Sequence, residues 1–160
     1  MMRGKNPWIF SVSLLVAMML MVMPIAPELQ PLRPAWIALV LAYWIIETPE
    51  KVSMALAFFL GLIEDLVVGS VMGENALRLV VVTFILMQFR ARIRFFPLSQ
   101  QAAVIAAVLL NDRLISTVLH TFWGVPNPPL IAWTTPLLAF VLWPLIFMAL
   151  DSLRLRAWKR

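Results

Sequence analysis

Apolar residues dominate the chain in six runs that are separated by prolines or charged residues. A helix that crosses a bilayer needs roughly 20 mostly apolar residues, with a range near 17–25. The pattern therefore predicts an all-α, polytopic integral membrane protein with about six transmembrane helices, forming one domain over residues 1–160. The expected helices cover residues 8–23, 34–47, 52–68, 76–91, 98–122 and 130–150. The second and fourth runs are short, and they span only if flanking polar residues enter the interface or the bilayer thins locally.

The basic residues are unevenly distributed among the segments that connect these helices. Lysine and arginine in short loops stay on the cytoplasmic side. With six helices, ten of the thirteen basic residues fall on the side of both chain ends, which predicts cytoplasmic N- and C-termini. These ten residues are Arg3, Lys5, Lys51, Arg90, Arg92, Arg94, Arg154, Arg156, Lys159 and Arg160. The N-terminal stretch also resembles a signal peptide, but Pro24-Ile25-Ala26-Pro27 is not a small-residue cleavage site, so we expect it to remain as the first helix.

Composition supports a lipid environment and excludes several kinds of site. The chain is 62% hydrophobic and 13% charged, an apolar excess that a small soluble core cannot bury. The net charge of +5 comes from residues that flank apolar runs, so we expect no nucleic-acid partner. Without cysteine, and with His120 as the single histidine, the sequence favours no metal or cofactor site. It has no phosphate-binding loop and no nucleophile elbow, so we expect no enzymatic activity.

The fifth run carries the charged residues that are most costly in a membrane. Asp112 and Arg113 lie near its middle, and adjacent helical residues point about 100° apart, so each should find a partner on another helix. Asp112 and His120 belong to a polar stripe that should face the interior of the bundle. The stripe favours either an ion, proton or substrate path, with a proton-coupled channel as one form, or polar contacts that fix helix packing. We favour packing, because no second run offers a matching polar stripe.

Small residues follow one line along the third run, in a pattern that allows close helix approach. They are Ser53, Ala57, Gly61, Asp65 and Gly69, spaced four apart. If the chain turns near Met72, Arg78 comes level with Asp65. We therefore hypothesise an Asp65–Arg78 ion pair that locks this hairpin.

Proline and arginine mark the remaining segments. Prolines fill the connections near residues 24–34 and 126–129, which predicts short, extended loops, and Pro136 and Pro144 predict a kink in the last helix. Arg90, Arg92 and Arg94 are bordered by Phe89, Phe95 and Phe96. They indicate membrane orientation, and they also suit anionic lipid on the cytoplasmic face or a docked cytoplasmic protein.

Several motifs together resemble the bacterial rod shape-determining protein MreD family over nearly the whole chain. They are Arg33-Pro34-x-Trp36, Tyr43-Trp44, Pro49, Gly61-x-x-x-Asp65-Leu66-x-x-Gly69, Gly73-x-x-Ala76-Leu77, Asp112 and Leu142-Trp143-Pro144.

The resemblance implies a non-enzymatic scaffold in the inner membrane that serves lateral wall synthesis in rod-shaped bacteria. It implies MreC as the main partner, with MreB, RodA and the partner transpeptidase of RodA as further ones. Aromatic side chains such as Trp36, Trp44 and Trp143 are expected to anchor at membrane interfaces and partner surfaces. The alternative is a vitamin-like substrate-binding component of an energy-coupling-factor transporter, although Ala17 is the only alanine in the first helix and the usual alanine contact motif is absent.

Overall fold

The computed structural model describes residues 7–158, which form six α-helices and three short 3-10 helices with no strand among them. The helices are α1 (Pro7–Val22), η1 (Pro27–Leu32), α2 (Trp36–Glu47), η2 (Pro49–Lys51), α3 (Met54–Val68), α4 (Glu74–Ile93), α5 (Leu98–Trp123), η3 (Leu130–Thr134) and α6 (Thr135–Trp158). The all-helical fold class predicted from the apolar runs is confirmed. Four of the basic residues used to predict orientation, Arg3, Lys5, Lys159 and Arg160, lie outside the described residues.

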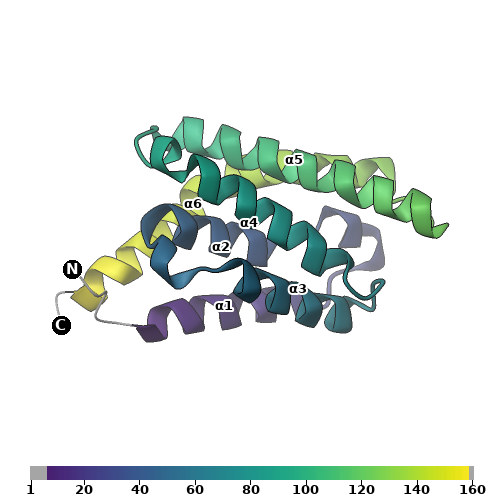
Figure 1. Ribbon diagram of the computed structural model, residues 1–160, viewed down its shortest axis with the longest axis horizontal. Coiled ribbons are helices and arrows are strands. Elements are labelled where there is room, and N and C mark those ends of the chain that lie inside the picture. The colour runs from purple at the N-terminus through teal and green to yellow at the C-terminus, as the bar shows by residue number, and fades with distance from the viewer. Residues whose placement is uncertain (1–6, 159–160) are drawn as a thin grey trace.

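Helix α2 lies at the centre of the bundle and contacts α1, α4 and α6 (Figure 1). Helix α3 packs along α4, and α5 packs against both α4 and α6. In Figure 1, α5 lies along one side, α1 and α3 along the other, and α2 and α4 between them, while α6 runs from behind α5 towards the start of α1. The start of α1 and the end of α6 lie at the same end of the bundle (Figure 1).

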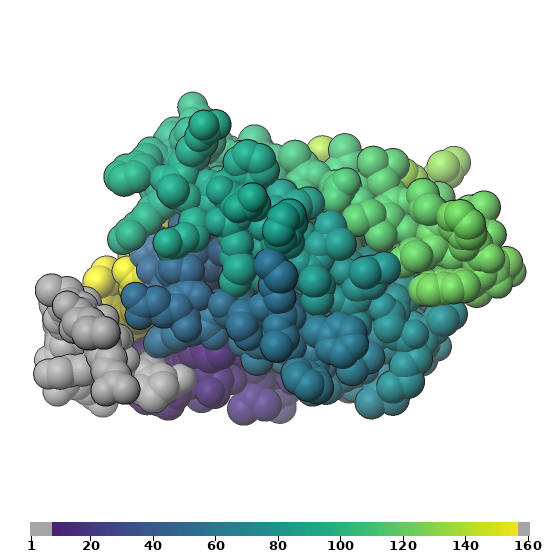
Figure 2. Space-filling model, in the orientation of Figure 1, coloured from purple at the N-terminus to yellow at the C-terminus, as the bar shows by residue number. Residues whose placement is uncertain are grey.

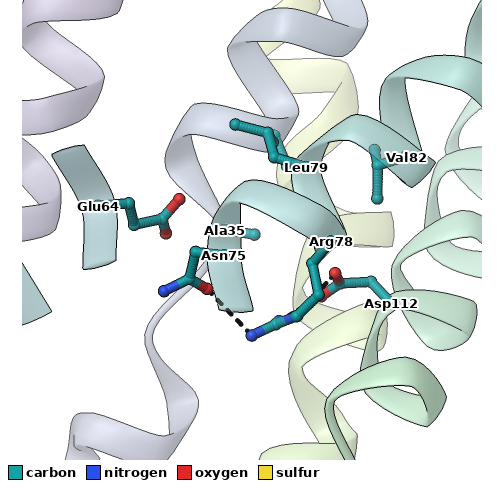
Figure 3. Close-up of a pocket in the computed structure, with 8 residues that line it drawn as sticks. Ala35, Glu64, Asn75, Arg78, Leu79, Val82 and Asp112 are labelled. Carbon is teal, nitrogen blue, oxygen red and sulfur yellow. Dashed lines mark hydrogen bonds and ion pairs between the residues drawn. The ribbon is translucent and has the colours of Figure 1, made fainter. Parts of the chain in front are cut away.

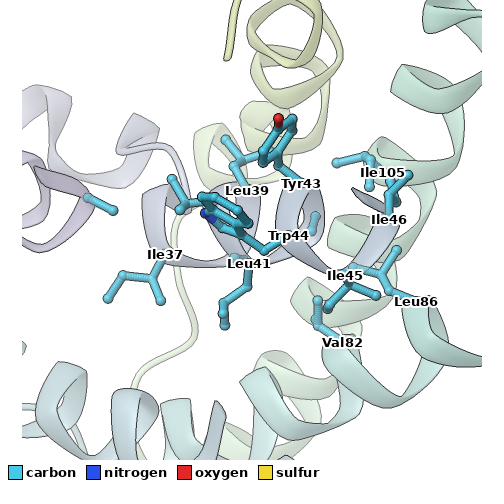
Figure 4. Packing of buried hydrophobic residues seen from close by; sticks show 14 of the residues in the cluster. Ile37, Leu39, Leu41, Tyr43, Trp44, Ile45, Ile46, Val82, Leu86 and Ile105 are labelled. Carbon is cyan, nitrogen blue, oxygen red and sulfur yellow. The ribbon is translucent and has the colours of Figure 1, made fainter. Parts of the chain in front are cut away.

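The position of α2 follows from its sequence, which is apolar on every side. All residues from 37 to 46 are buried, and Tyr43 and Trp44 are among the largest enclosed side chains (Figure 4). A helix that is hydrophobic all round is stable where other helices cover every face. The polar indole nitrogen of Trp44 also has a partner, because Nε1 donates a hydrogen bond to Ser13 Oγ on α1 at 2.9 Å.

The predicted close approach of another helix to the small residues of α3 is confirmed at Gly61. A Cβ atom added there would lie 2.5 Å from the Ala76 nitrogen and 2.7 Å from the Asn75 carbonyl carbon of α4. The connecting turn is bounded by Gly69 and Gly73, whose φ angles of 73° and 97° suit glycine. These contacts bring the two helix backbones together and set the register of the hairpin.

Several local expectations need correction. The segment before α2 is not a fully extended loop, since Pro27–Leu32 forms a 3-10 helix. Helix α4 runs from Glu74 to Ile93, so Arg90 and Arg92 lie in its last turn, where the negative end of the helix dipole favours cations. Leu130–Thr134 forms a 3-10 helix, and Pro136 therefore lies in the first turn of α6. Pro144 lies inside α6, where the expected kink stays a prediction.

The outer surface of the bundle is rich in apolar side chains, as a lipid environment requires. Large hydrophobic residues are exposed on α1, α3, α5 and α6. The middle of the face seen in Figure 2 is formed by α3 and α4, and α5 extends past them at one end. Three segments of the described chain are long and apolar enough to span a membrane, namely Pro27–Glu47, Leu98–Trp123 and Leu130–Arg156, and Trp8–Val22 is a shorter apolar helix.

Candidate functional site

The candidate site is a polar network between α3, α4 and α5, and it begins at Asp65. This side chain accepts hydrogen bonds from Ser70 Oγ at 2.7 Å, Gly73 N at 2.8 Å and Asn75 N at 2.9 Å. Asp65 therefore holds the turn closed and satisfies backbone donors at the start of α4, which a helix cannot satisfy by itself. The hypothesised Asp65–Arg78 pair is wrong, because these turn amides already use the carboxylate.

Arg78 instead pairs with Asp112 across the α4–α5 interface. Nε lies 2.9 Å from Asp112 Oδ1 and Nη2 lies 2.5 Å from Oδ2, a two-point arrangement that fixes the relative orientation of both groups. The remaining nitrogen, Nη1, donates to Asn75 Oδ1 at 3.1 Å (Figure 3). Arg78 thus points from α4 towards α5, away from the α3 carboxylate that we expected it to meet.

Glu74 extends the network towards the end of α5. Its Oε1 atom accepts from Ser116 Oγ at 3.2 Å and lies 2.9 Å from His120 Nε2 and 3.5 Å from Arg78 Nη1. The other ring nitrogen of His120 lies 3.0 Å from the Pro126 carbonyl oxygen. Both ring nitrogens therefore lie within hydrogen-bond distance of an oxygen atom, so His120 joins α4 to the segment that follows α5.

Arg113 points to a different helix, as the angle between adjacent helical residues predicts. Its Nη2 atom donates to Thr135 Oγ1, at the start of α6, at 3.2 Å. Asp112 contacts α4 while Arg113 contacts α6, so the prediction that they pair with other helices rather than with one another is confirmed. The two charges tie α5 to both of its neighbours.

Sequence reasoning missed Glu74 and Asn75, and it wrongly concluded that no second helix matches the polar stripe of α5. The predicted helix began at residue 76, whereas α4 begins at Glu74. A carboxylate directly after Gly73 is a helix-start signal, because acidic residues favour the first turn. Together with Arg78, these residues give α4 the matching polar face.

A second set of predicted residues lies in the core rather than at a surface. Trp44 and Trp143 are 1% and 0% exposed, so the expectation that they anchor at membrane interfaces or partner surfaces is wrong. Trp143 Nε1 donates to Gln101 Oε1 at 3.4 Å, and Gln101 Nε2 donates to the Phe96 carbonyl oxygen at 3.1 Å. A buried indole needs such a partner, and the core supplies one.

The C-terminal end of α2 is tied to α6. Glu47 Oε2 accepts from Arg154 Nη1 at 2.6 Å, and the Tyr43 hydroxyl donates to Asp151 Oδ1 at 3.4 Å. The Lys51 amino group lies over the Trp44 ring, 4.9 Å from its centroid. Burial is the main cause that lowers the pKa of Lys51, and repulsion from Arg154 lowers it further.

The remaining predicted residues lie apart from the network. Arg33 donates to the Met23 carbonyl oxygen at 2.9 Å and so fixes the connection between α1 and α2. Pro34 precedes α2, and the half-buried Trp36 is the first residue of that helix. Pro144 is half-buried beside Trp143. None of these side chains contacts the Arg78–Asp112 pair.

The polar network between α3, α4 and α5 is suited to holding these helices together. A cavity of about 30 Å³ adjoins the pair, and within the described chain no group of three or more acidic or histidine side chains is placed to hold a metal ion. Acidic and basic side chains of α4 and α5 pair with one another, and Asp65 of α3 binds the turn that leads into α4. A helical bundle with an exposed apolar surface and ion pairs inside it is an integral membrane protein.

The comparisons with known proteins identify the family. The family model of the rod shape-determining protein MreD matches residues 2–153. A curated relative from Haemophilus influenzae, named rod shape-determining protein MreD, is 32% identical over 146 residues, which cover 87% of this chain and 86% of the relative. The chain therefore belongs to the MreD family of rod shape-determining proteins, as its motifs predicted. No solved structure gives a significant match to it.

Proposed function

We propose that this protein is a non-enzymatic scaffold of the bacterial inner membrane that maintains rod cell shape by docking MreC and the proteins of lateral peptidoglycan synthesis. Membership of the MreD family supports a role in shape determination. The observation that carries the scaffold proposal is the mutual pairing of the intramembrane charges. Arg78, Asp112 and Glu74 use one another as partners, which favours a rigid bundle over a catalytic or transport site.

The partners meet this bundle at the membrane. MreC is the main partner in this proposal, and MreB, RodA and the transpeptidase that works with RodA are further ones. Exposed apolar side chains on α1, α3, α5 and α6 offer helix-sized faces to lipid or to partner helices. The motif residues Arg33, Trp36, Gly61 and Asp65 serve this function indirectly, by holding those faces in fixed positions.

The proposal includes a multi-pass orientation with both termini in the cytoplasm. Lys51, the arginines at 90, 92 and 94, and the arginines at 154 and 156 belong to segments at the end of the bundle where α1 starts and α6 ends (Figure 1). The segments at the opposite end carry Arg33 and the acidic Glu28. Such an excess of basic residues marks the cytoplasmic side and attracts anionic lipid there.

The transporter alternative gains no support from the polar site. Small-molecule sites occupy roughly 300–1,000 Å³. The cavity beside Arg78 and Asp112 measures about 30 Å³, which is too small for a vitamin-like ligand.

Co-purification from bacterial membranes tests the scaffold proposal. The tagged chain, solubilised in mild detergent, should enrich MreC and wall-synthesis proteins in mass spectrometry, and the wild-type gene should restore rod shape to cells depleted of their own MreD. An unrelated membrane protein with the same tag controls for nonspecific binding. The variant Glu50→Gln, at an exposed position in η2, should behave like wild type. Consistent recovery of an ATP-driven importer, with no MreC, would overturn the proposal.

A further inference from the structure

The cavity of about 30 Å³ lies where α2, α3, α4 and α5 meet (Figure 3). Its apolar wall consists of Ala35, Ala38, Leu79 and Val82, and its polar wall consists of Glu64, Asn75, Arg78 and Asp112. A cavity of about 10–15 Å³ is already large enough for one water molecule, provided that polar partners surround it. This cavity meets both conditions.

Glu64 is the one carboxyl group on this wall that has no partner among the described residues. It is half-buried on α3, and it takes part in no hydrogen bond or ion pair with the described part of the chain. The guanidinium opposite is already occupied, because Arg78 binds Asp112 with two nitrogens and Asn75 with the third. Figure 3 shows the Glu64 carboxyl group extending from α3 towards Asn75.

The charges around Glu64 do not balance if every acid is ionised. Helix α3 adds Asp65, α4 adds Glu74 and Arg78, and α5 adds Asp112, Arg113 and His120. The start of α2 contributes only Ala35 and Ala38 to the cavity wall and adds no charge. Four carboxyl groups thus face at most three cations. An uncompensated charge inside a membrane is costly, and such a group neutralises instead. Asp65, Glu74 and Asp112 each accept hydrogen bonds from protein donors. Glu64 accepts none, so it is the group that takes up a proton.

We propose that the cavity is a hydrated proton-holding site, in which Glu64 carries one exchangeable proton and a water molecule links its carboxyl group to the Arg78–Asp112 pair. The proton comes from solvent water and returns to it, and no other bond forms or breaks. The site explains why a carboxyl group without a protein partner is stable at the junction of four helices. It is independent of the partners that the scaffold binds.

Infrared difference spectroscopy on the whole protein in lipid nanodiscs tests the proposal. Glutamate labelled with ¹³C at its side-chain carboxyl group assigns the signal to glutamate, as opposed to aspartate, without any substitution. At neutral pH the wild type should show the carbonyl band of a protonated carboxyl group, and this band should shift with the label and again in D2O. Glu64→Gln should abolish the band, and Glu50→Gln, at an exposed position far from the cavity, should retain it.

Four results would overturn the proposal. They are the absence of a protonated-carboxyl band in the labelled wild type, a band insensitive to D2O, a band lost in Glu74→Gln but kept in Glu64→Gln, and a band removed by sodium ions at constant pH. A missing band excludes the proton, and a band insensitive to D2O excludes its exchange with water. Loss of the band only in Glu74→Gln places the proton on Glu74, and displacement by sodium ions shows a cation site. The absence of the band in the labelled wild type overturns the proposal even where a variant fails to fold, and the folded variants identify which glutamate carries the proton.

Discussion

A charged side chain at the centre of a bilayer costs about 2.5–3.5 kcal/mol on insertion scales, so each charge inside this bundle needs a partner. Asp112 has that partner in Arg78, through two hydrogen bonds, and the pair is mostly shielded from the surroundings. Removing one member of a buried pair is more damaging than removing both, because the remaining charge stays buried without compensation. The contribution of either residue to stability therefore depends on the presence of the other.

A double-mutant cycle on Arg78 and Asp112 measures this coupling. Asp112→Asn alone should reduce the free energy of unfolding by about 3–5 kcal/mol, since it leaves the guanidinium unpaired. Combining it with Arg78→Gln should cost less than the sum of the two single changes, with an interaction energy of about 0.5–3 kcal/mol. Thermal and denaturant unfolding in one detergent provides the comparison.

The matched control is the cycle of Asp65→Asn with Arg78→Gln. Asp65 is bonded to the turn and is linked to Arg78 only through Asn75, so the interaction energy in this cycle should be clearly smaller than in the Asp112 cycle. Strong coupling in the control cycle, together with additivity in the Asp112 cycle, would contradict the observed pairing.

At the scale of helices, the crossing of α3 and α4 depends on the absence of a side chain at Gly61. A Cβ atom there would meet the backbone of Ala76 and Asn75, which cannot move aside as a flexible side chain can. Close backbone contact of this kind is how membrane helices gain packing energy, since lipid provides no hydrophobic driving force between them. The hairpin is therefore specified by the smallest residue on its contact line.

Gly61→Ala should destabilise the protein by about 1–3 kcal/mol, because the added methyl group overpacks the crossing. Ala55→Val adds bulk to an exposed position of the same helix and serves as the control. The midpoint of thermal unfolding should fall for the first variant and change little for the second. Equal midpoints for Gly61→Ala and wild type would show that the two helices separate without cost.

The sequence predicted the order of the helices and the small residues of the α3–α4 crossing, because both depend on local periodicity. It did not predict which charges meet. Arg78 and Asp112 are separated by 34 positions along the chain, and their meeting depends on the register of α4 against α5. Nor did it predict the burial of Trp44, because an all-apolar helix looks the same whether lipid or protein surrounds it.

For the molecule as a whole, the gathering of most basic residues at one end of the bundle makes orientation directly testable. The chain has no cysteine, so single cysteines report their own location without background. In spheroplasts, Asn127→Cys should react with a membrane-impermeant maleimide, whereas Ser99→Cys should react only after permeabilisation. Both positions are exposed, at opposite ends of α5. The reverse labelling pattern would place both termini outside the cytoplasm.

The enclosure of α2 also bears on how the protein is made. A helix of 12 residues is only about 18 Å long, well short of a bilayer core of about 30 Å, so it is poorly suited to stand alone in lipid. Two of the helices that surround it, α4 and α6, are synthesised after it. The centre of the molecule is consequently completed only after α6 has been synthesised, and a chain interrupted before α6 exposes its middle to insertase and quality-control proteases.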